Sequence, residues 1–126
     1  MERCFFGLGA VSAFLGVAAG AFGAHGLKTR LPPDLLAVFE VGVRYHLLHA
    51  VGLMLSAWAV HRWPGSVVTW SGWSFAAGTL IFSGSLYALA LTGQRWLGAV
   101  TPLGGLAFLV GWLCLAWGAW KGLAGL

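Results

Sequence analysis

The polar residues best able to do chemistry gather in one short stretch of the chain. They are Glu40, Arg44, Tyr45, His46 and His49. Glu40 and Arg44 are four residues apart with the acid first, which is the favoured order for an ion pair along a helix. We therefore expect these two side chains to pair. A guanidinium has five donors, more than one carboxylate can satisfy, so the network should extend to His25 or Tyr45.

The histidines could in principle bind a metal or haem iron, because imidazole is a common ligand of both. His46 and His49 are three residues apart, so on a helix their side chains point about 60° apart. No third ligand stands at helical spacing, and His25 precedes the pair by a loop. We predict no metal and no cofactor, and expect each histidine to form hydrogen bonds inside the fold. The candidate partners are Ser83, Ser85 and Tyr87.

Catalytic groups are scarce in this sequence. It has three acidic residues, and only Glu40 is placed for general acid–base chemistry. It contains no nucleophile–base set, phosphate-binding loop or pair of carboxylates. The sequence therefore predicts a protein that is not an enzyme.

The composition decides which class of protein must position these residues. The chain has 126 residues, of which 8% are charged and 60% apolar, with a mean hydropathy of +0.87. A soluble domain of this length has too little interior to hide so much apolar surface. Disorder is excluded as well, because it needs low hydrophobicity and high charge. The seven basic residues are dispersed, which argues against a nucleic-acid partner. The chain is an integral membrane protein whose partner is the lipid bilayer.

The charged residues divide the chain into four apolar runs, each near the length of about 20 residues that crosses a bilayer as a helix. The predicted helices cover about 4–24, 41–60, 68–92 and 97–120. The expected fold is an all-α, four-helix membrane bundle in a single transmembrane domain, 1–126. Gly93 is placed to stop the third helix. Pro102 lies inside the fourth helix and should permit a bend.

The segment between the first two crossings, about 25–40, differs from the other connections. Pro33 suits the first position of a helix, and Asp34 suits the positive end of its dipole. A helix from Pro33 to Val60 would be about 42 Å long, which exceeds the hydrocarbon core of about 30 Å. We therefore expect an interfacial helical stretch before the second transmembrane helix, or a tilted helix.

Small residues recur along all four predicted helices, often seven positions apart. In a membrane, close approach of backbones through small residues drives helix association. A period of seven implies left-handed crossings near about +20°. The glycines expected to pack against neighbouring helices are Gly9, Gly16, Gly23, Gly42, Gly52, Gly78, Gly104, Gly111 and Gly118.

In this setting the polar cluster has two interpretations. The pair Glu40 and Arg44 either fixes the depth of its helix at the membrane boundary, or belongs to a polar binding site in the mouth of the bundle. Hydroxyl groups in membrane helices usually bond to neighbouring helices. The candidate polar or binding residues are His25, Glu40, Arg44, Tyr45, His46, His49, Ser83, Ser85, Tyr87 and Thr101.

Three blocks of sequence carry a resemblance to a known family. The blocks are 20–27 (GAFGAHGL), 39–50 (FxxGVRYHxxHA) and 82–87 (FSGSLY), the last followed by matching positions between 91 and 105. Together they resemble the domain of unknown function 423 family, which includes YgdD-like small inner membrane proteins and the eukaryotic transmembrane protein 256. The resemblance covers nearly the whole chain. It implies a small multi-pass protein, in the inner (plasma) membrane of a bacterium, and no particular activity.

Three hypotheses for the function follow. The first is a non-enzymatic subunit or accessory of a membrane assembly, as a homo-oligomer or within a larger membrane complex. The second is a small transporter or proton-linked channel that uses Glu40, Arg44 and His49. The third is a haem- or quinone-binding redox protein. A polar cavity reaching Arg44 and His49 would favour the second.

Overall fold

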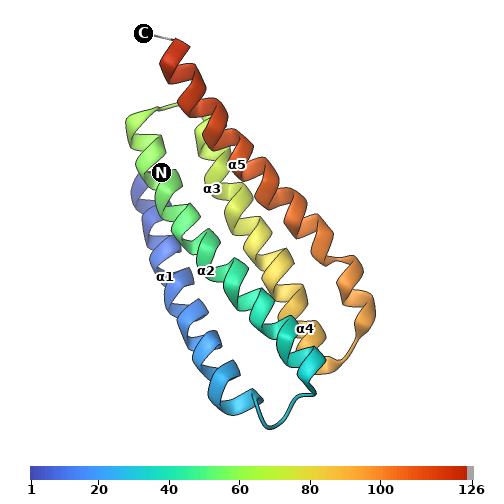
Figure 1. Cartoon of the computed structure of the whole chain (residues 1–126). Coiled ribbons are helices and arrows are strands. Elements are labelled where there is room, and N and C mark those ends of the chain that lie inside the picture. The colour runs from blue at the N-terminus through green and yellow to red at the C-terminus, as the bar shows by residue number, and fades with distance from the viewer. Residues whose placement is uncertain (125–126) are drawn as a thin grey trace.

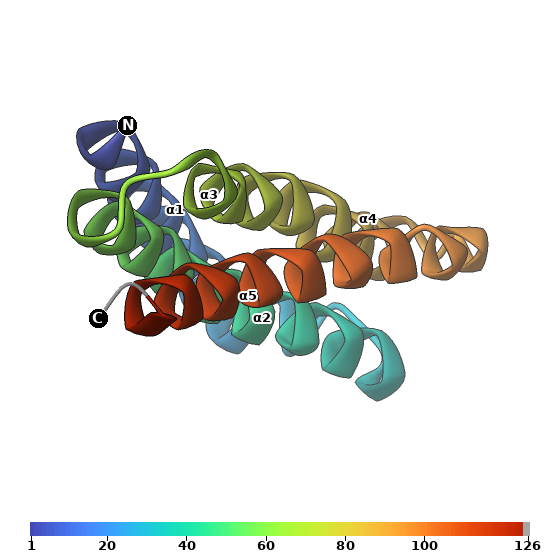
Figure 2. The same ribbon diagram turned by 90° about the horizontal axis from the view of Figure 1, so that it is seen from above.

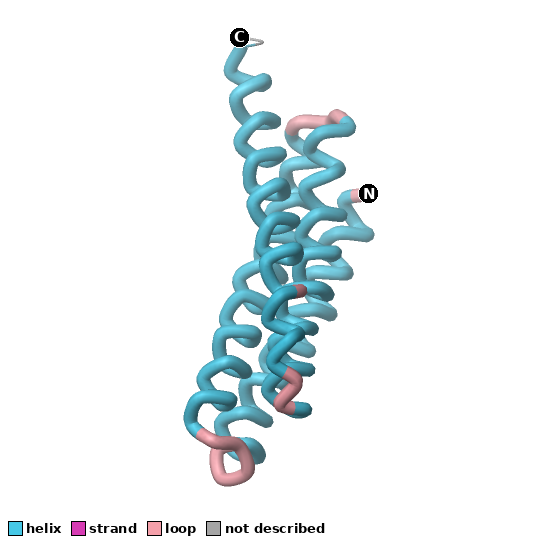
Figure 3. The backbone as a smooth tube through the Cα atoms, turned by 90° about the vertical axis from the view of Figure 1, so that its right-hand side faces the viewer, coloured by secondary structure: helices cyan, strands magenta, loops and turns pink. Residues whose placement is uncertain are grey.

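The computed structural model describes residues 1–124, and the side chains of residues 1–121. Over this range all regular structure is helical and no strand occurs (Figure 3). The helices are α1 (Glu2–Phe22), α2 (Pro33–Arg62), α3 (Ser66–Gly78), α4 (Gly84–Thr92) and α5 (Thr101–Ala124). Two five-residue segments are π-helical. Gly23–Leu27 follows α1, and Thr79–Ser83 joins α3 to α4. A 3₁₀ turn, Arg95–Ala99, precedes α5.

Four helical spans are long and apolar enough to cross a membrane. They are Glu2–Leu27, Pro33–Arg62, Ser66–Thr92 and Arg95–Lys121. This confirms the predicted all-α architecture and its four crossings. The segment Ser66–Thr92, which contains α3, the π-helical segment and α4, is called the third span below.

Consecutive spans run antiparallel because their connections are short (Figure 1). α2 lies at the centre: α1 packs mainly on α2, the third span packs on both α2 and α5, and α2 also touches α5. Seen from above, α1 and α2 run together and cross the direction of α3, α4 and α5 (Figure 2). The main helix contacts therefore follow the order of the sequence: α1 with α2, α2 with the third span, and the third span with α5.

The ends of the helices follow from local chemistry. α2 begins at Pro33, as predicted, and its 30 residues make it about 45 Å long. Gly93 ends α4 in the left-handed region at φ 73°, which glycine adopts without a steric cost. The predicted position of Pro102 inside the fourth helix is wrong for the α-helix itself. α5 begins at Thr101 after the 3₁₀ turn, so Pro102 lies in its first turn, where the missing backbone N–H needs no partner.

The nine glycines named above are all buried against another helix. On α1, a Cβ atom added to Gly9 would lie 2.8 Å from the Ala50 carbonyl oxygen of α2. On α5, Gly104, Gly111 and Gly118 face Phe82, Phe75 and Val68 of the third span. The small residues thus lie at helix contacts, where the period of seven places them.

Aromatic rings fill the space that these glycines leave. Phe75 is fully buried, and its ring lies between Gly52 of α2 and Gly111 of α5. It belongs to the larger apolar core together with Phe5, Leu53, Ala57 and Phe108. The ring of Phe75 thus fills the space between α2 and α5. A Cβ at Gly111 would lie 2.5 Å from it, so that side admits only glycine, and a Cβ at Gly52 would make a tight contact of 3.2 Å.

Candidate functional site

The inner polar side chains of α2 bond to other spans. His46 is buried, and its Nδ1 lies 2.8 Å from the hydroxyl of Tyr87 on α4. This partner is one of the three predicted from the sequence. The bond joins α2 to the third span at the middle of α2.

His49 is held more tightly still, with 2% of its surface exposed. Its Nδ1 lies 2.8 Å from the Tyr45 carbonyl oxygen and its Nε2 lies 3.0 Å from the indole nitrogen of Trp112 on α5. A carbonyl only accepts and an indole N–H only donates, so Nδ1 carries the proton and Nε2 accepts. The ring also stacks on Phe108 at 3.5 Å between centroids. Both nitrogens of the neutral imidazole are occupied, so His49 is a structural link between α2 and α5.

Hydroxyl groups make the remaining polar links between spans. The bonds are Ser56 to Ser71 at 2.8 Å, Ser83 to the Gly42 carbonyl oxygen at 2.7 Å, and Ser85 to Thr101 at 2.6 Å. Each joins two different spans in the apolar interior, as hydroxyls in membrane helices commonly do.

The predicted ion pair between Glu40 and Arg44 is wrong. Within residues 1–121 the carboxylates that contact a basic side chain are Glu2, 2.9 Å from His61 Nδ1, and Asp34, which forms an ion pair with Arg95 at 3.0 Å. Glu40 and Arg44 are both exposed, Glu40 in the third turn of α2 and Arg44 one turn further toward its middle. An exposed i, i+4 pair contributes only about 0.3–0.5 kcal/mol, so solvation of the two separate charges competes easily.

The predicted extension of that network is wrong as well. His25 is exposed in the π-helical segment Gly23–Leu27. The Tyr45 ring packs against Phe82 and Phe108, and it is the Tyr45 carbonyl, not the hydroxyl, that takes part in a hydrogen bond. The structure therefore brings together one part of the predicted candidates and leaves the others apart. The part brought together is His46 with Tyr87, Ser83 with α2, and Ser85 with Thr101.

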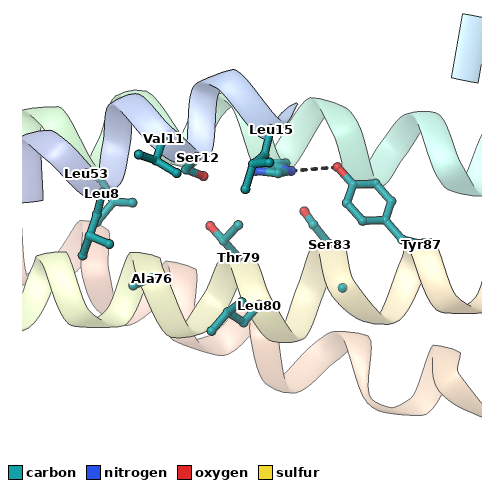
Figure 4. Close-up of a pocket in the computed structure, with 12 residues that line it drawn as sticks. Leu8, Val11, Ser12, Leu15, Leu53, Ala76, Thr79, Leu80, Ser83 and Tyr87 are labelled. Atoms are coloured by element: carbon teal, nitrogen blue, oxygen red, sulfur yellow. Dashed lines mark hydrogen bonds between the residues drawn. The ribbon is translucent and has the colours of Figure 1, made fainter. Parts of the chain in front are cut away.

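A cavity of about 330 Å³ adjoins the His46–Tyr87 bond, between α1, α2 and the third span (Figure 4). Its walls are mostly apolar. The apolar lining consists of Leu8, Val11, Leu15, Leu53, Ala76, Leu80 and Gly84, and the polar lining of Ser12, His46, Thr79, Ser83 and Tyr87. Figure 4 shows the hydroxyls of Thr79 and Ser83 on the side of the third span that faces α1 and α2, where that of Ser83 donates to the Gly42 carbonyl oxygen.

The cavity exists because α1 has only one close neighbour along most of its length. Gly9, Gly16 and Gly23 all face α2. Toward the third span, α1 contributes Phe5, whose ring lies against Gly72 and edge-on to Trp73. Beyond Phe5 the two spans separate, and the cavity lies in that gap.

Two polar residues of the cavity, Ser12 and Thr79, were not among the residues predicted from the sequence. Thr79 is the more informative of the two. Its Oγ1 is buried and has no hydrogen-bond partner in the described part of the chain. Among residues 1–121 it is the one buried side-chain oxygen or nitrogen of which this is true. It begins the π-helical segment Thr79–Ser83, and such segments often occur at functional sites. A threonine in a regular helix usually bonds to the carbonyl four residues earlier, as Thr92 does to Ala88. A signal was present: Thr79, Ser83 and Tyr87 are spaced by four, which puts them on one helix face.

Comparison with known proteins places this fold in a family. The family model described as "Protein of unknown function (DUF423)" matches residues 19–105. The chain belongs to this family. The match confirms the resemblance drawn from the three sequence blocks. It extends from the end of α1 into α5, and so includes His46, His49, Thr79, Ser83 and Tyr87; Ser12 lies outside it.

Relatives in several bacteria are similar over almost their whole length. The chain is 46% identical to the UPF0382 membrane protein YwdK of Bacillus subtilis over 120 residues, 94% of this chain and 98% of that protein. It is 44% identical to the UPF0382 membrane protein SSP2132 of Staphylococcus saprophyticus, and the match covers 94% of this chain and 98% of that protein. It is 38% identical to a UPF0382 membrane protein of Haemophilus influenzae, and the match covers 96% of this chain and 97% of that protein. No solved structure matches the chain.

Proposed function

We propose that the chain is a non-enzymatic subunit or accessory of a membrane assembly, in the plasma (inner) membrane of a bacterium. One observation carries the proposal: in the described spans, His46, His49 and Tyr87 are all engaged in hydrogen bonds between helices. Acid–base catalysis needs a group that is free to exchange a proton with a substrate. Here the bond between His46 Nδ1 and the Tyr87 hydroxyl links α2 to α4, and the bond from Trp112 to His49 Nε2 links α2 to α5. The other nitrogen of His49 is bonded within α2.

The outer faces of the bundle supply surface for partners. α5 presents a row of large apolar side chains to its surroundings: Leu103, Leu106, Leu109, Leu113, Trp117 and Trp120. Lipid is as apolar as these residues, so the row can face lipid or the matching surface of another helix, including a second copy of this chain. The bacterial origin of the relatives and the helical spans support a location in the plasma membrane.

The transporter hypothesis has less support from the geometry. It needs Glu40, Arg44 and His49 to line one polar path. Glu40 and Arg44 are exposed on α2, whereas His49 is buried with both nitrogens bonded. The cavity beside α2 is lined by His46 and is mostly apolar. A charged solute would lose its hydration there without gaining a charged partner.

Photo-crosslinking in intact cells tests the assembly. A photoreactive amino acid is placed at Leu106 or Leu113 on the outer face of α5, and at buried Phe108 on its inner face as a control. We expect the outer positions to give one crosslinked product of discrete mass. Once mass spectrometry has identified the partner in that product, purification through a tag on the partner should recover the same product. The Phe108 position should give none. Lipid adducts alone at both outer positions, with a single chain per particle in native mass spectrometry, would overturn the proposal.

A further inference from the structure

We propose that the cavity between α1, α2 and the third span binds one uncharged, lipid-soluble molecule that carries a carbonyl oxygen, with the hydroxyl of Thr79 as its hydrogen-bond donor. This goes beyond the role in an assembly proposed above. Three features support it: the unpartnered oxygen of Thr79, the composition of the cavity wall, and the depth of the cavity within the spans.

The hydrogen-bonding groups of the cavity define the polar part of the ligand. Ser83 donates to the Gly42 carbonyl, and Tyr87 is bonded to His46. Thr79 Oγ1 is buried without a partner in the part of the chain described. A buried hydroxyl without a partner is costly, and its O–H needs an acceptor. A carbonyl supplies that acceptor without adding a donor that would need a partner of its own. Because Oγ1 has almost no accessible surface, the Thr79 side chain has to turn toward the cavity to donate to the ligand. Among the polar groups that line this cavity, Thr79 is the one that is buried and uncommitted, so the ligand needs an acceptor oxygen.

The wall of the cavity defines the rest of the ligand. No lysine, arginine, aspartate or glutamate is among its lining residues, half of which are leucine, valine or alanine. An ionised group would therefore be desolvated without a counter-charge, so the ligand is neutral. The volume of about 330 Å³ lies within the range of sites for small molecules.

The depth of the cavity selects a molecule that dissolves in hydrocarbon. Thr79 stands at the middle of the third span, Ser66–Thr92, and the α1 residues of the wall, Leu8 to Leu15, lie in the middle part of Glu2–Leu27. Entry is from the side, because the large apolar residues that border the cavity on α1 and the third span are exposed. They are Leu8, Val11, Leu15 and Leu80. A neutral carbonyl compound can reach this depth from the bilayer.

A matched pair of photoreactive probes tests the role of the carbonyl. One is a long-chain methyl ketone with a diazirine and a terminal alkyne; the other has a methylene in place of the carbonyl. The full-length protein is reconstituted in nanodiscs. We expect the ketone to label residues 8–15 and 76–87 in a saturable way, with at least about threefold higher apparent affinity than the hydrocarbon. A net hydrogen bond of about 0.5–1.5 kcal/mol corresponds to about 2–13-fold.

Two variants separate ligand binding from folding. Thr79→Val has nearly the same shape and should remove the preference for the ketone, whereas Thr79→Ser should keep it. Gly84→Leu should abolish labelling by both probes, because a Cβ at Gly84 meets nothing within 4 Å and the side chain can enter the cavity. Thr92→Val is the control, since its exposed hydroxyl bonds to the Ala88 carbonyl outside the cavity.

Competition identifies the natural source of the carbonyl. Decylubiquinone offers a quinone carbonyl, and dioleoylglycerol offers an ester carbonyl; displacement of the ketone by either supports the proposal and distinguishes the two. Failure of both to compete would overturn it. So would equal labelling by ketone and hydrocarbon with no effect of Thr79→Val, which would mean that acyl chains fill the cavity without recognition.

Discussion

The two sides of α2 are built differently. Toward the third span and α5, the ring of Phe75 lies against Gly52 of α2 and Gly111 of α5, and Gly104 of α5 meets the backbone of Phe82. Polar atoms on that side are paired, as His49 is with Trp112. On the side of α1 the glycines face only α2, and between α1 and the third span there remains a cavity with the unpartnered oxygen of Thr79. The same small-residue packing thus closes one side and leaves the other open, because α1 has one close neighbour and the third span has two.

Leucine substitutions at glycines on the two sides should give the largest contrast. Gly111→Leu places a side chain where the ring of Phe75 lies, so we expect overpacking to destabilise the bundle by about 1–3 kcal/mol. Gly84→Leu projects into the open space and should change stability little. Thermal unfolding of the purified variants in one detergent measures both. Equal melting temperatures for the two variants would contradict the comparison.

Loss of one polar pair on the closed side should have the next largest effect. Trp112→Phe keeps a ring but removes the donor to His49 Nε2, which leaves a buried acceptor unsatisfied at a cost of about 1–2 kcal/mol. Trp117→Phe is the matched control, because Trp117 is exposed on the same helix. Denaturant titration followed by circular dichroism separates them. A control as destabilised as Trp112→Phe would show that the hydrogen bond to His49 is not the cause.

Thr79 and Ser83 should respond with opposite signs to loss of the hydroxyl. Thr79→Val removes a buried oxygen without a partner, so the ligand-free protein should become more stable, by up to about 1 kcal/mol. Ser83→Ala loses the bond to the Gly42 carbonyl and should be destabilised by about 1 kcal/mol. Unfolding of delipidated protein provides the measurement. Destabilisation by Thr79→Val would mean that its hydroxyl is satisfied.

The elements of the fold could be predicted because hydropathy and charge act locally. The four spans and the start of α2 at Pro33 follow from run length and from the missing N–H of proline. The glycine positions follow from the period of seven. Tyr87, the partner of His46, was one of three candidates predicted, because few polar groups exist in the interior to satisfy an imidazole. For His49 the three candidates were wrong, since its partners are the Tyr45 carbonyl and Trp112. Composition limits the choice of partner when polar residues are rare.

What failed depended on tertiary arrangement or on small energies. The pairing of Asp34 with Arg95 links residues 61 positions apart, and it depends on which helix ends meet. The π-helical segment at Thr79 lies where Phe75 and Phe82 pack against glycines of α5, and no local sequence rule marks it. Glu40 and Arg44 were expected to pair because of their spacing, but an ion pair at that spacing stabilises a helix only slightly.

The acidic residues at the start of α2 should show the smallest effects, and they test whether the polar site extends beyond the cavity. Asp34 pairs with Arg95 at 3.0 Å, yet both side chains are more than half exposed, so solvent and salt screen the attraction. Glu40 is exposed and lacks an ion-pair partner among residues 1–121. Asp34→Asn and Glu40→Gln should therefore leave the unfolding midpoint unchanged within error at 150 mM salt. At low ionic strength Asp34→Asn alone should lower it, because the unscreened pair then contributes. A large loss of stability or of ligand labelling in Glu40→Gln would instead place that carboxylate in a functional network with Arg44, and would revive the transporter hypothesis.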